Sequence, residues 1–264
     1  MSNDYVEYQM LRPRELVRRR EQMPVAYFGI GILEWHGLHN PLGLDGVKAN
    51  GIACHLARTL GGVVMPAQFW GDNRNEVAEL AFDPKINPWL PNGMPDQTFA
   101  IADLMHLDKK DFETDAERSI KSGGWRLWKE LMLQSMFEIE TLGFDKIVLI
   151  PGHYPLFEPL RQVIQTYAER QGKCSVLMLT DYMFSEKGDS GDHAAMFETS
   201  LMMALYPDRV DISQLGEDMV ELPIGVAGKD PRSFASREMG CEILEKFVSI
   251  VQAFIEEDKT TDPA

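Results

Sequence analysis

The chain has 264 residues, enough for one large domain or two small ones with a sizeable buried core. Acidic side chains outnumber basic ones by 41 to 26, and the formal net charge of −15 argues against nucleic acid or an anionic membrane as a partner. No apolar run approaches the ~20 residues of a membrane helix and the N-terminus lacks the apolar core of a signal peptide, so a cytoplasmic protein is expected. The three cysteines show no CxxC spacing, which argues against a disulfide framework or a thiolate zinc site; all three are expected to be buried.

Apolar runs and helix-spaced patterns alternate along the chain. The segment VAYFGIGIL (25–33) is a nearly continuous apolar run, as in a strand buried on both faces. A helix over 46–60 and a second strand over 61–67 follow. The same patterns then predict a helix over 125–142, a strand over 146–153, a helix over 158–171, a strand over 175–181, a helix over 194–206 and a long helix over about 236–256. The apolar stripe of the helix over 125–142 comprises Trp128, Leu131, Met132, Ile139 and Leu142.

This alternation favours an α/β protein with a mostly parallel central sheet and helices on both faces. No repeat or low-complexity linker divides the sequence, so a single domain over residues 1–264 is expected. Residues 71–124 interrupt this alternation. The segment FDPKINPWLPNGMPDQ contains four prolines, which exclude a regular helix or central strand there. We expect an irregular insertion, of the kind that often forms a lid or a partner surface.

The stretch LEWHGLHNPLGLDG (33–46) places several metal-capable side chains directly after the first predicted strand. Ligands of open parallel sheets bind beyond the carboxyl ends of the strands. Glu34 and His36 lie two apart in an extended segment and therefore project to the same side. Taken alone, His36 suggests a hydrogen-bonded structural histidine and Asp45 a helix N-cap. His39 lies nearby without an identifiable partner.

The other strand ends favour a metal site instead. The third predicted strand ends in IPGHY, which brings His153 to the same edge, and His193 and Glu198 follow the fourth strand around a helix start. Histidine and carboxylate without cysteine suit a borderline metal ion such as zinc or manganese. A carboxylate such as Asp45 can bridge two ions, as in two-metal hydrolases.

Several of these segments also resemble, in order, the motifs of the creatininase (creatinine amidohydrolase) family. GILEWHGLHNPLGLD resembles its G-x-x-E-x-H-G-x-H pattern with a following Asp, and IPGHY resembles its N-G-H element. DHAAMFETSLMMALYPDRVD is similar to its third element, and ASREMG (235–240) to its tail. The resemblance spans nearly the whole chain and is weakest over 71–124.

The resemblance implies a three-layer α/β/α metallohydrolase with two divalent ions per chain, zinc and/or manganese, usually assembled as a homohexamer built as a trimer of dimers. By position, Glu34 and His153 would bind one ion and His36 the other, with Asp45 as the bridge. His193 matches the catalytic histidine that carries a proton to the leaving group.

Three further positions are assigned from the same resemblance. Tyr154 matches a substrate-contacting position. Glu198 is a candidate catalytic residue with three open roles: a metal ligand, a group that orients His193 or a ligand, or a helix cap. Pro155 stands where creatininase carries a glutamate ligand of the second ion, so Glu198 or water would have to take that place.

The predicted pocket also departs from creatininase near the catalytic histidine. Asp189 stands where creatininase has a tryptophan, and Asp192 directly precedes His193. Both are candidate substrate-binding residues. Carboxylates accept hydrogen bonds from hydroxyl groups, so this pocket suits a polyhydroxylated substrate better than a flat creatinine ring.

These features predict a metal-dependent hydrolase, an amidohydrolase in which a metal-activated water attacks a small cyclic amide or a related carbonyl substrate. Two alternatives stay open. One is a ring-opening carbon–carbon hydrolase acting on a cyclic polyol ketone of the inosose type, which needs the same ions. The other is a non-catalytic metal- or sugar-binding protein, against which His193 argues, since a binder needs no placed proton carrier. The expected partners are a small-molecule substrate and further copies of the chain.

Overall fold

The computed structural model describes residues 5–70, 103–108, 110–111, 114, 118, 121, 123–179, 192–220 and 222–257. Within these residues the strands form one parallel sheet of order β2-β1-β3-β4. The strands are β1 (Val25–Ile30), β2 (Val63–Val64), β3 (Lys146–Pro151) and β4 (Ser175–Met178). β1 and β3 pair along their whole length, from Val25 opposite Lys146 to Ile30 opposite Pro151. The predicted parallel sheet is confirmed.

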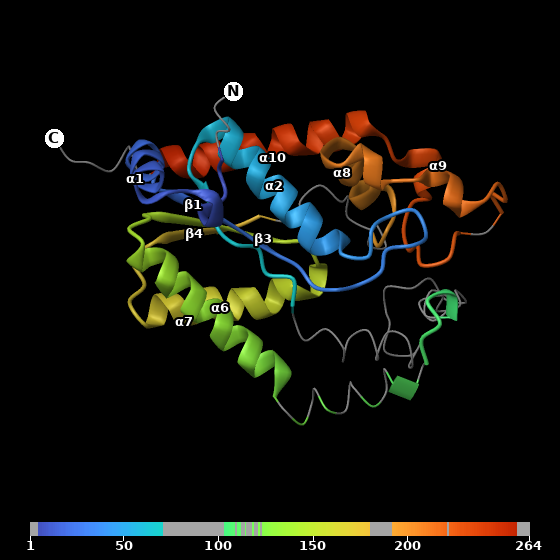
Figure 1. Ribbon diagram of the computed structural model, residues 1–264, viewed down its shortest axis with the longest axis horizontal. Coiled ribbons are helices and arrows are strands. Elements are labelled where there is room, and N and C mark those ends of the chain that lie inside the picture. Colours follow the sequence, from blue (N-terminus) through green and yellow to red (C-terminus); the bar gives the residue numbers. More distant parts are fainter. Residues whose placement is uncertain are drawn as a thin grey trace.

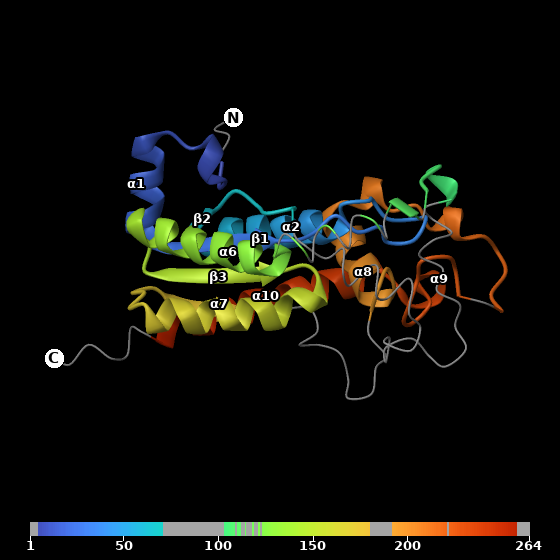
Figure 2. The ribbon, with the colours of Figure 1, turned by 90° about the horizontal axis from the view of Figure 1, so that it is seen from below.

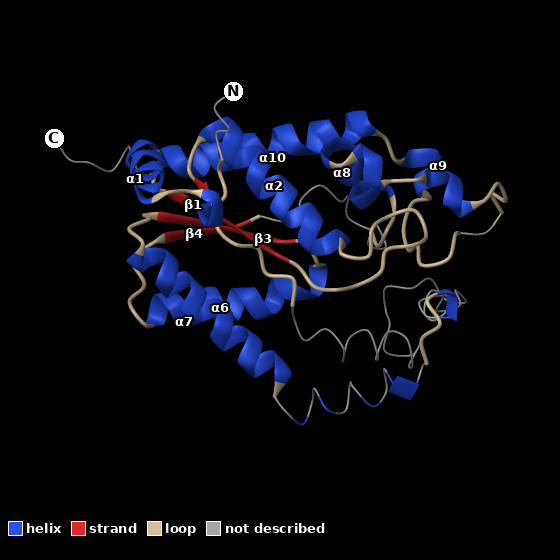
Figure 3. Ribbon diagram, in the orientation of Figure 1, coloured by secondary structure: helices blue, strands red, loops and turns tan. Residues whose placement is uncertain are grey.

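Helices cover both faces of this sheet (Figures 1 and 3). One layer contains α2 (Leu44–Leu60), α8 (Met196–Leu205) and α10 (Arg237–Glu257). The other contains α6 (Gly124–Thr141) and α7 (Phe157–Glu169), which Figure 2 shows on the near side of the strands. The shorter helices are α1 (Pro13–Gln22) and α9 (Pro231–Phe234), with 3₁₀ turns at Tyr8–Met10, Tyr154–Leu156, Pro207–Arg209 and Ile212–Leu215. The three-layer α/β/α architecture expected from the sequence is confirmed.

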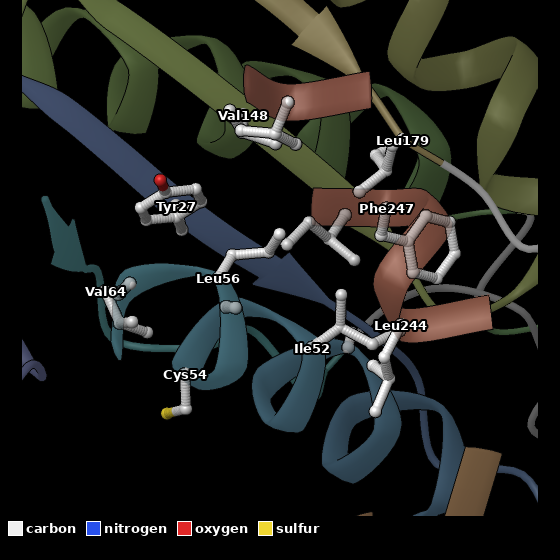
Figure 4. Packing of buried hydrophobic residues seen from close by; sticks show 14 of the residues in the cluster. Tyr27, Ile52, Cys54, Leu56, Val64, Val148, Leu179, Leu244 and Phe247 are labelled. Atoms are coloured by element: carbon white, nitrogen blue, oxygen red, sulfur yellow. The ribbon is translucent and has the colours of Figure 1, made fainter. Parts of the chain in front are cut away.

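The alternation of side chains along the strands creates two apolar layers. Val148 and Ile150 of β3 pack with α2 and α10. Figure 4 shows this layer, in which Val148 and Phe247 of α10 are labelled. Ile147 and Leu149, which point the other way, pack with α6 and α7. Because both faces are covered, the central strands read as continuous apolar runs in the sequence.

Two expectations about burial, those for Leu131 and Cys241, are wrong. Leu131 of α6 is half-exposed. The face of α6 that packs on the sheet includes Leu133 and Met136, and Leu131 lies outside that face. Cys241 is exposed on α10, whereas Cys54 and Cys174 are buried as expected. The side chains of β4 are only partly buried, since this strand has β3 as its one neighbour within the described sheet.

Most of the predicted insertion over 71–124 lies outside the described residues, so the arrangement as a single domain stays a prediction. Among the helices of the described ranges, none has the length and apolar character required to cross a membrane.

Two glycines let the start of α2 lie directly against the ends of the central strands. A Cβ atom at Gly31 would collide with the backbone of Gly46, and a Cβ atom at Gly152 would collide with the carbonyl oxygen of Asp45. The Gly152 N–H also donates a hydrogen bond to the carbonyl of Ile30 at 2.8 Å. This close contact holds Asp45, which has no exposed surface, between the ends of β1 and β3.

We therefore expect Gly152→Ala to lower the free energy of unfolding by at least about 2 kcal/mol, because the added methyl group overpacks a backbone contact that has no room to relax. Urea unfolding measures the loss. The matched control is Gly43→Ala, whose added Cβ would meet only ordinary van der Waals neighbours in Phe69 and Val47. Equal stability of the Gly152→Ala and Gly43→Ala proteins would contradict the proposed contact.

Candidate metal centre

The carboxyl edge of the sheet gathers the polar residues that the sequence singled out. Two come from the loop after β1, one follows β3, one lies in the first turn of α2, and two lie at the start of α8 or directly before it. The six residues brought together are Glu34, His36, Asp45, His153, His193 and Glu198.

The first group of donors consists of Glu34, Asp45 and His153. His153 Nδ1 lies 3.0 Å from Glu34 Oε2 and 3.4 Å from Asp45 Oδ2. Neither Glu34 Oε2 nor either Asp45 oxygen has a hydrogen-bond partner among the described residues, although all three atoms are buried. Two ligands of one tetrahedral zinc ion, each at about 2.1 Å, are separated by about 3.4 Å. The group therefore has the donor types and the spacing of a site for one divalent ion.

A second group shares Asp45 with the first. His36 Nε2 lies 3.1 Å from Asp45 Oδ1, the other oxygen of that carboxylate, and 3.5 Å from Glu198 Oε2. The nitrogen is also 3.8 Å from Glu34 Oε2, which lies 3.8 Å from His193 Nδ1. Asp45 thus presents one oxygen to each group, as a carboxylate that bridges two ions would.

Burial and mutual contact shift the pKa values of this cluster. Burial alone lowers the pKa of His36, but Asp45 and Glu198 outweigh it and raise the pKa to about 9. Burial alone raises the pKa of Glu34, but His153 and the other nearby histidines outweigh it and lower the pKa to about 2. The pKa of Asp45 is likewise held well below its ordinary value against the effect of burial, chiefly by His36. The carboxylates are therefore ionised, and positive charge must accompany them.

Glu198 is more tightly held than the sequence suggested. Its Oε1 accepts a hydrogen bond from Lys48 Nζ at 2.6 Å, and its Oε2 accepts one from the Ala194 N–H at 2.8 Å. The same Oε2 lies 3.5 Å from His36 Nε2, so Glu198 is also within reach as a ligand beside His36 and Asp45. Lys48 could hardly be identified from the sequence, because its one signal is its position three residues after Asp45, on the same face of α2.

His193 lies at the open side of the cluster. Its side chain is about one-third exposed, and its ring centroid lies 4.4 Å from that of His36. The backbone is fixed by two hydrogen bonds with Ala227, at 2.8 and 2.9 Å. The next residue, Ala194, has a φ of 52°, a left-handed conformation that non-glycine residues rarely adopt and that tends to occur at functional sites. Burial lowers the pKa of His193, which favours the neutral ring that can accept a proton.

The predicted substrate-binding residues fall in three different settings. Asp192 is buried, and its two oxygens accept the N–H groups of Phe197 and Glu198 at 3.0 and 2.8 Å, so it caps α8. Tyr154 is exposed beside the cluster, at the start of a 3₁₀ turn. Asp189 lies outside the described residues. Contacts of these three residues with a substrate stay predictions.

His39 is a structural histidine rather than a member of the cluster. Its Nε2 lies 2.9 Å from Thr199 Oγ1 and 3.0 Å from Asn40 Nδ2, and its carbonyl accepts the Asp211 N–H. Burial lowers the pKa of His39 to about 4, so its ring is neutral at pH 7. These bonds connect the loop after β1, which carries Glu34 and His36, to α8, which carries Glu198. They therefore help to fix the donors of the two segments relative to each other.

The chain is similar to creatininases in sequence and in fold. Residues 126–255 match the family model named Creatininase, described as creatinine amidohydrolase. The creatinine amidohydrolase of Pseudomonas putida is 25% identical over 247 residues, which cover 89% of each chain. A glutamate-to-glutamine variant of creatininase in a Zn–Zn form superposes with a TM-score of 0.63 at 21% identity, over 96% of this chain and 98% of that one. A manganese form of creatininase gives a TM-score of 0.61 at 20% identity, over the same shares of the two chains.

We expect zinc binding at pH 7 to release a proton from His36, because its pKa of about 9 leaves the metal-free ring protonated and a ligating nitrogen must be neutral. Zinc affinity should accordingly rise as the pH increases from 7 to 9. Calorimetric titration in two buffers of different ionisation enthalpy counts the protons. His36→Gln should release about one proton fewer, whereas His39→Gln, which replaces a neutral ring, should leave the count unchanged. Equal counts for the His36→Gln and wild-type proteins would contradict this assignment.

Proposed function

We propose that the chain is a metal-dependent hydrolase of the creatininase family, and that the residues around Asp45 would hold two divalent ions, zinc and/or manganese. The observation that carries this proposal is the arrangement of two donor groups, each with histidine and carboxylate atoms, around one buried carboxylate. The oxygen and nitrogen donors suit both metals. The Zn–Zn and manganese forms of similar creatininase structures support the same choice.

In this proposal each side chain of the cluster has a defined task. Glu34 and His153 would hold one ion, His36 and Glu198 would hold the other, and Asp45 would contribute an oxygen to each. Bound divalent ions supply Lewis acidity, which lowers the pKa of a nearby water towards neutrality and polarises a carbonyl group.

Hydrolysis also requires proton transfer. The position and the charge state of His193 suit it to this role. Hydrolysis of an amide requires a proton on the leaving nitrogen as the bond between carbon and nitrogen breaks. The ring of His193 is partly exposed next to the donor groups, and its lowered pKa keeps it neutral until it takes up a proton. His193 would accept the proton of the attacking water and deliver it to the leaving group.

The substrate class that we propose is a small cyclic amide or a related carbonyl compound. The Pseudomonas putida relative is a creatinine amidohydrolase, and amide hydrolysis needs only the groups described above. The main sequence argument for a polyol ketone was a pair of carboxylates near His193. One of them, Asp192, has both oxygens engaged by backbone N–H groups of α8. A carbon–carbon hydrolase is therefore the less favoured activity. The position of His193 as a proton carrier argues against a protein that only binds metal or sugar.

Two further parts of the proposal come from the sequence. A homohexamer built as a trimer of dimers is implied by the family resemblance alone, and a location in the cytoplasm is expected from the hydropathy of the chain. Sedimentation velocity on the purified chain distinguishes a hexamer from a smaller assembly.

Turnover of a panel of cyclic amides, beginning with creatinine, tests the proposed activity. The assays are run after zinc or manganese loading and again with excess chelator. We expect hydrolysis of at least one cyclic amide in the loaded protein and its loss on chelation. Turnover of a cyclic polyol ketone alone would overturn the substrate class, and stabilisation by ligands without any turnover would overturn the enzymatic role.

We expect His193→Asn to reduce kcat by about 10²- to 10⁴-fold, the usual contribution of a general acid or base. Its metal content, measured by elemental mass spectrometry, should equal that of the wild-type protein. His36→Ala is the matched comparison, because losing this ligand should lower both turnover and metal content. If His193→Asn lost metal as well, His193 would be a ligand and its assignment as a proton carrier would be wrong.

A further inference from the structure

Thr199 makes an unusual hydrogen bond at the start of α8, where it is fully buried. Threonine hydroxyls in helices commonly bond the carbonyl four residues earlier, as those of Thr59, Thr141 and Thr166 do in this chain. In Thr199 the backbone N–H donates to that carbonyl, of Ala195, at 3.1 Å. The hydroxyl donates instead to the carbonyl of Ala194, at 3.2 Å, which precedes the helix. The bond therefore acts on the path of the chain into α8.

Ala194 is a residue whose conformation must be held by its surroundings. Its φ of 52° is left-handed, and a non-glycine residue keeps such a conformation only where its neighbours enforce it. Its N–H donates to Glu198 Oε2 at 2.8 Å, and its carbonyl accepts the bond from Thr199. The N–H and carbonyl of His193, one residue earlier, are both bonded to Ala227. Together these bonds set the direction in which the His193 side chain leaves the backbone.

The hydroxyl of Thr199 also contacts the loop after β1. His39 Nε2 lies 2.9 Å from it, and Asn40 Nδ2 donates to it at 3.2 Å. The same loop carries Glu34 and His36, the two residues that face the ring of His193. One hydroxyl thus connects the segment that presents metal donors to the peptide that follows the proton carrier.

We propose that Thr199 is a positioning residue for His193: its hydroxyl holds Ala194 in the left-handed conformation and so keeps the His193 ring beside the metal donors. This inference rests on the proposed function, because it adds a residue to the same reaction. Without the hydroxyl, Ala194 relaxes to a negative φ, the peptide after His193 turns, and the ring moves. A displacement of about 1 Å can slow an enzymatic step about 100-fold.

Thr199→Val tests this inference, because it replaces the hydroxyl with a methyl group of similar shape. Turnover is measured on the zinc-loaded, full-length protein with creatinine, or with the cyclic amide of the panel that the wild type hydrolyses fastest. We expect kcat to fall by about 10- to 100-fold, with KM and zinc content unchanged. Thr199→Ser keeps the hydroxyl and should restore most of kcat.

Two double variants show whether the effect passes through Ala194 and His193. In a protein that already carries His193→Asn, Thr199→Val should cause no further loss of kcat, because residues that act as a unit are not additive. In a protein that carries Ala194→Gly, the loss caused by Thr199→Val should be smaller, because glycine adopts the left-handed conformation without support.

Ser200→Ala is the matched control. Ser200 is the next residue of α8 and is also fully buried, but its hydroxyl donates to the Met196 carbonyl and accepts the Ser236 N–H at 3.0 Å. Its removal should lower the free energy of unfolding and leave kcat unchanged. If Thr199→Val does not fold, Thr199→Ala takes its place in each assay.

Crystal structures of the wild-type, Thr199→Val and Thr199→Ser proteins provide a readout that does not depend on turnover. We expect a positive φ at Ala194 in the wild-type and Thr199→Ser proteins. In Thr199→Val the φ should be negative and the His193 ring displaced from His36.

An unchanged kcat in Thr199→Val, an equal loss in the presence of His193→Asn, a loss of bound zinc, or a left-handed Ala194 with an unmoved His193 ring would each overturn the inference. A Thr199→Ser protein as slow as Thr199→Val would overturn it as well. None of these results removes the proposed function. Absence of turnover of every cyclic amide by the wild-type protein would overturn the proposed activity, and the catalytic role of Thr199 with it, whatever the crystal structures show.

Discussion

The arrangement of the site depends on one buried carboxylate. Asp45 has no exposed surface, and its two oxygens face His36 and His153 without a hydrogen bond from any described residue. Removing such a charge from water costs several kcal/mol unless a cation compensates it. The dipole of α2 stabilises a negative charge in its first turn, but this effect is worth only about 0.3–1 kcal/mol at an exposed helix end. In the metal-free protein the compensation must come from protonated histidine, and in the proposed metal-loaded protein it would come from the divalent ions.

The backbone fixes where that carboxylate lies. β1 and β3 are neighbours in the sheet although more than a hundred residues separate them in the chain, so the loops that follow them meet at one edge. Gly31 and Gly152 then allow the start of α2 to approach both strand ends. The approach places Asp45 between two loops, each of which carries a histidine. On the far side, the bonds of His39 to α8 bring Glu198 and the segment of His193 into the same cluster.

The sequence predicted most of this arrangement because its two strongest signals are local. Continuous apolar runs marked the strands, and the rule that ligands bind at the carboxyl edge of a parallel sheet then brought six polar residues together from four segments. Properties set by packing between distant segments could not be predicted in this way. A lysine on a helix suggests a solvated face, and only the packing of α8 against α2 shows that Lys48 is buried against Glu198. The capping role of Asp192 depends on the path of the chain into α8, and the exposure of Leu131 depends on which side of α6 meets the sheet.

The structure and the similarity to creatininases lead us to propose that the cluster around Asp45 is a divalent metal site. Anomalous diffraction at the zinc absorption edge, from crystals grown with zinc, tests it most directly because it locates the ion itself. We expect an anomalous peak within about 2.0–2.2 Å of Glu34, Asp45 and His153 donor atoms, as for zinc bound to carboxylate and imidazole. A zinc-loaded crystal with no peak between these three residues would contradict it.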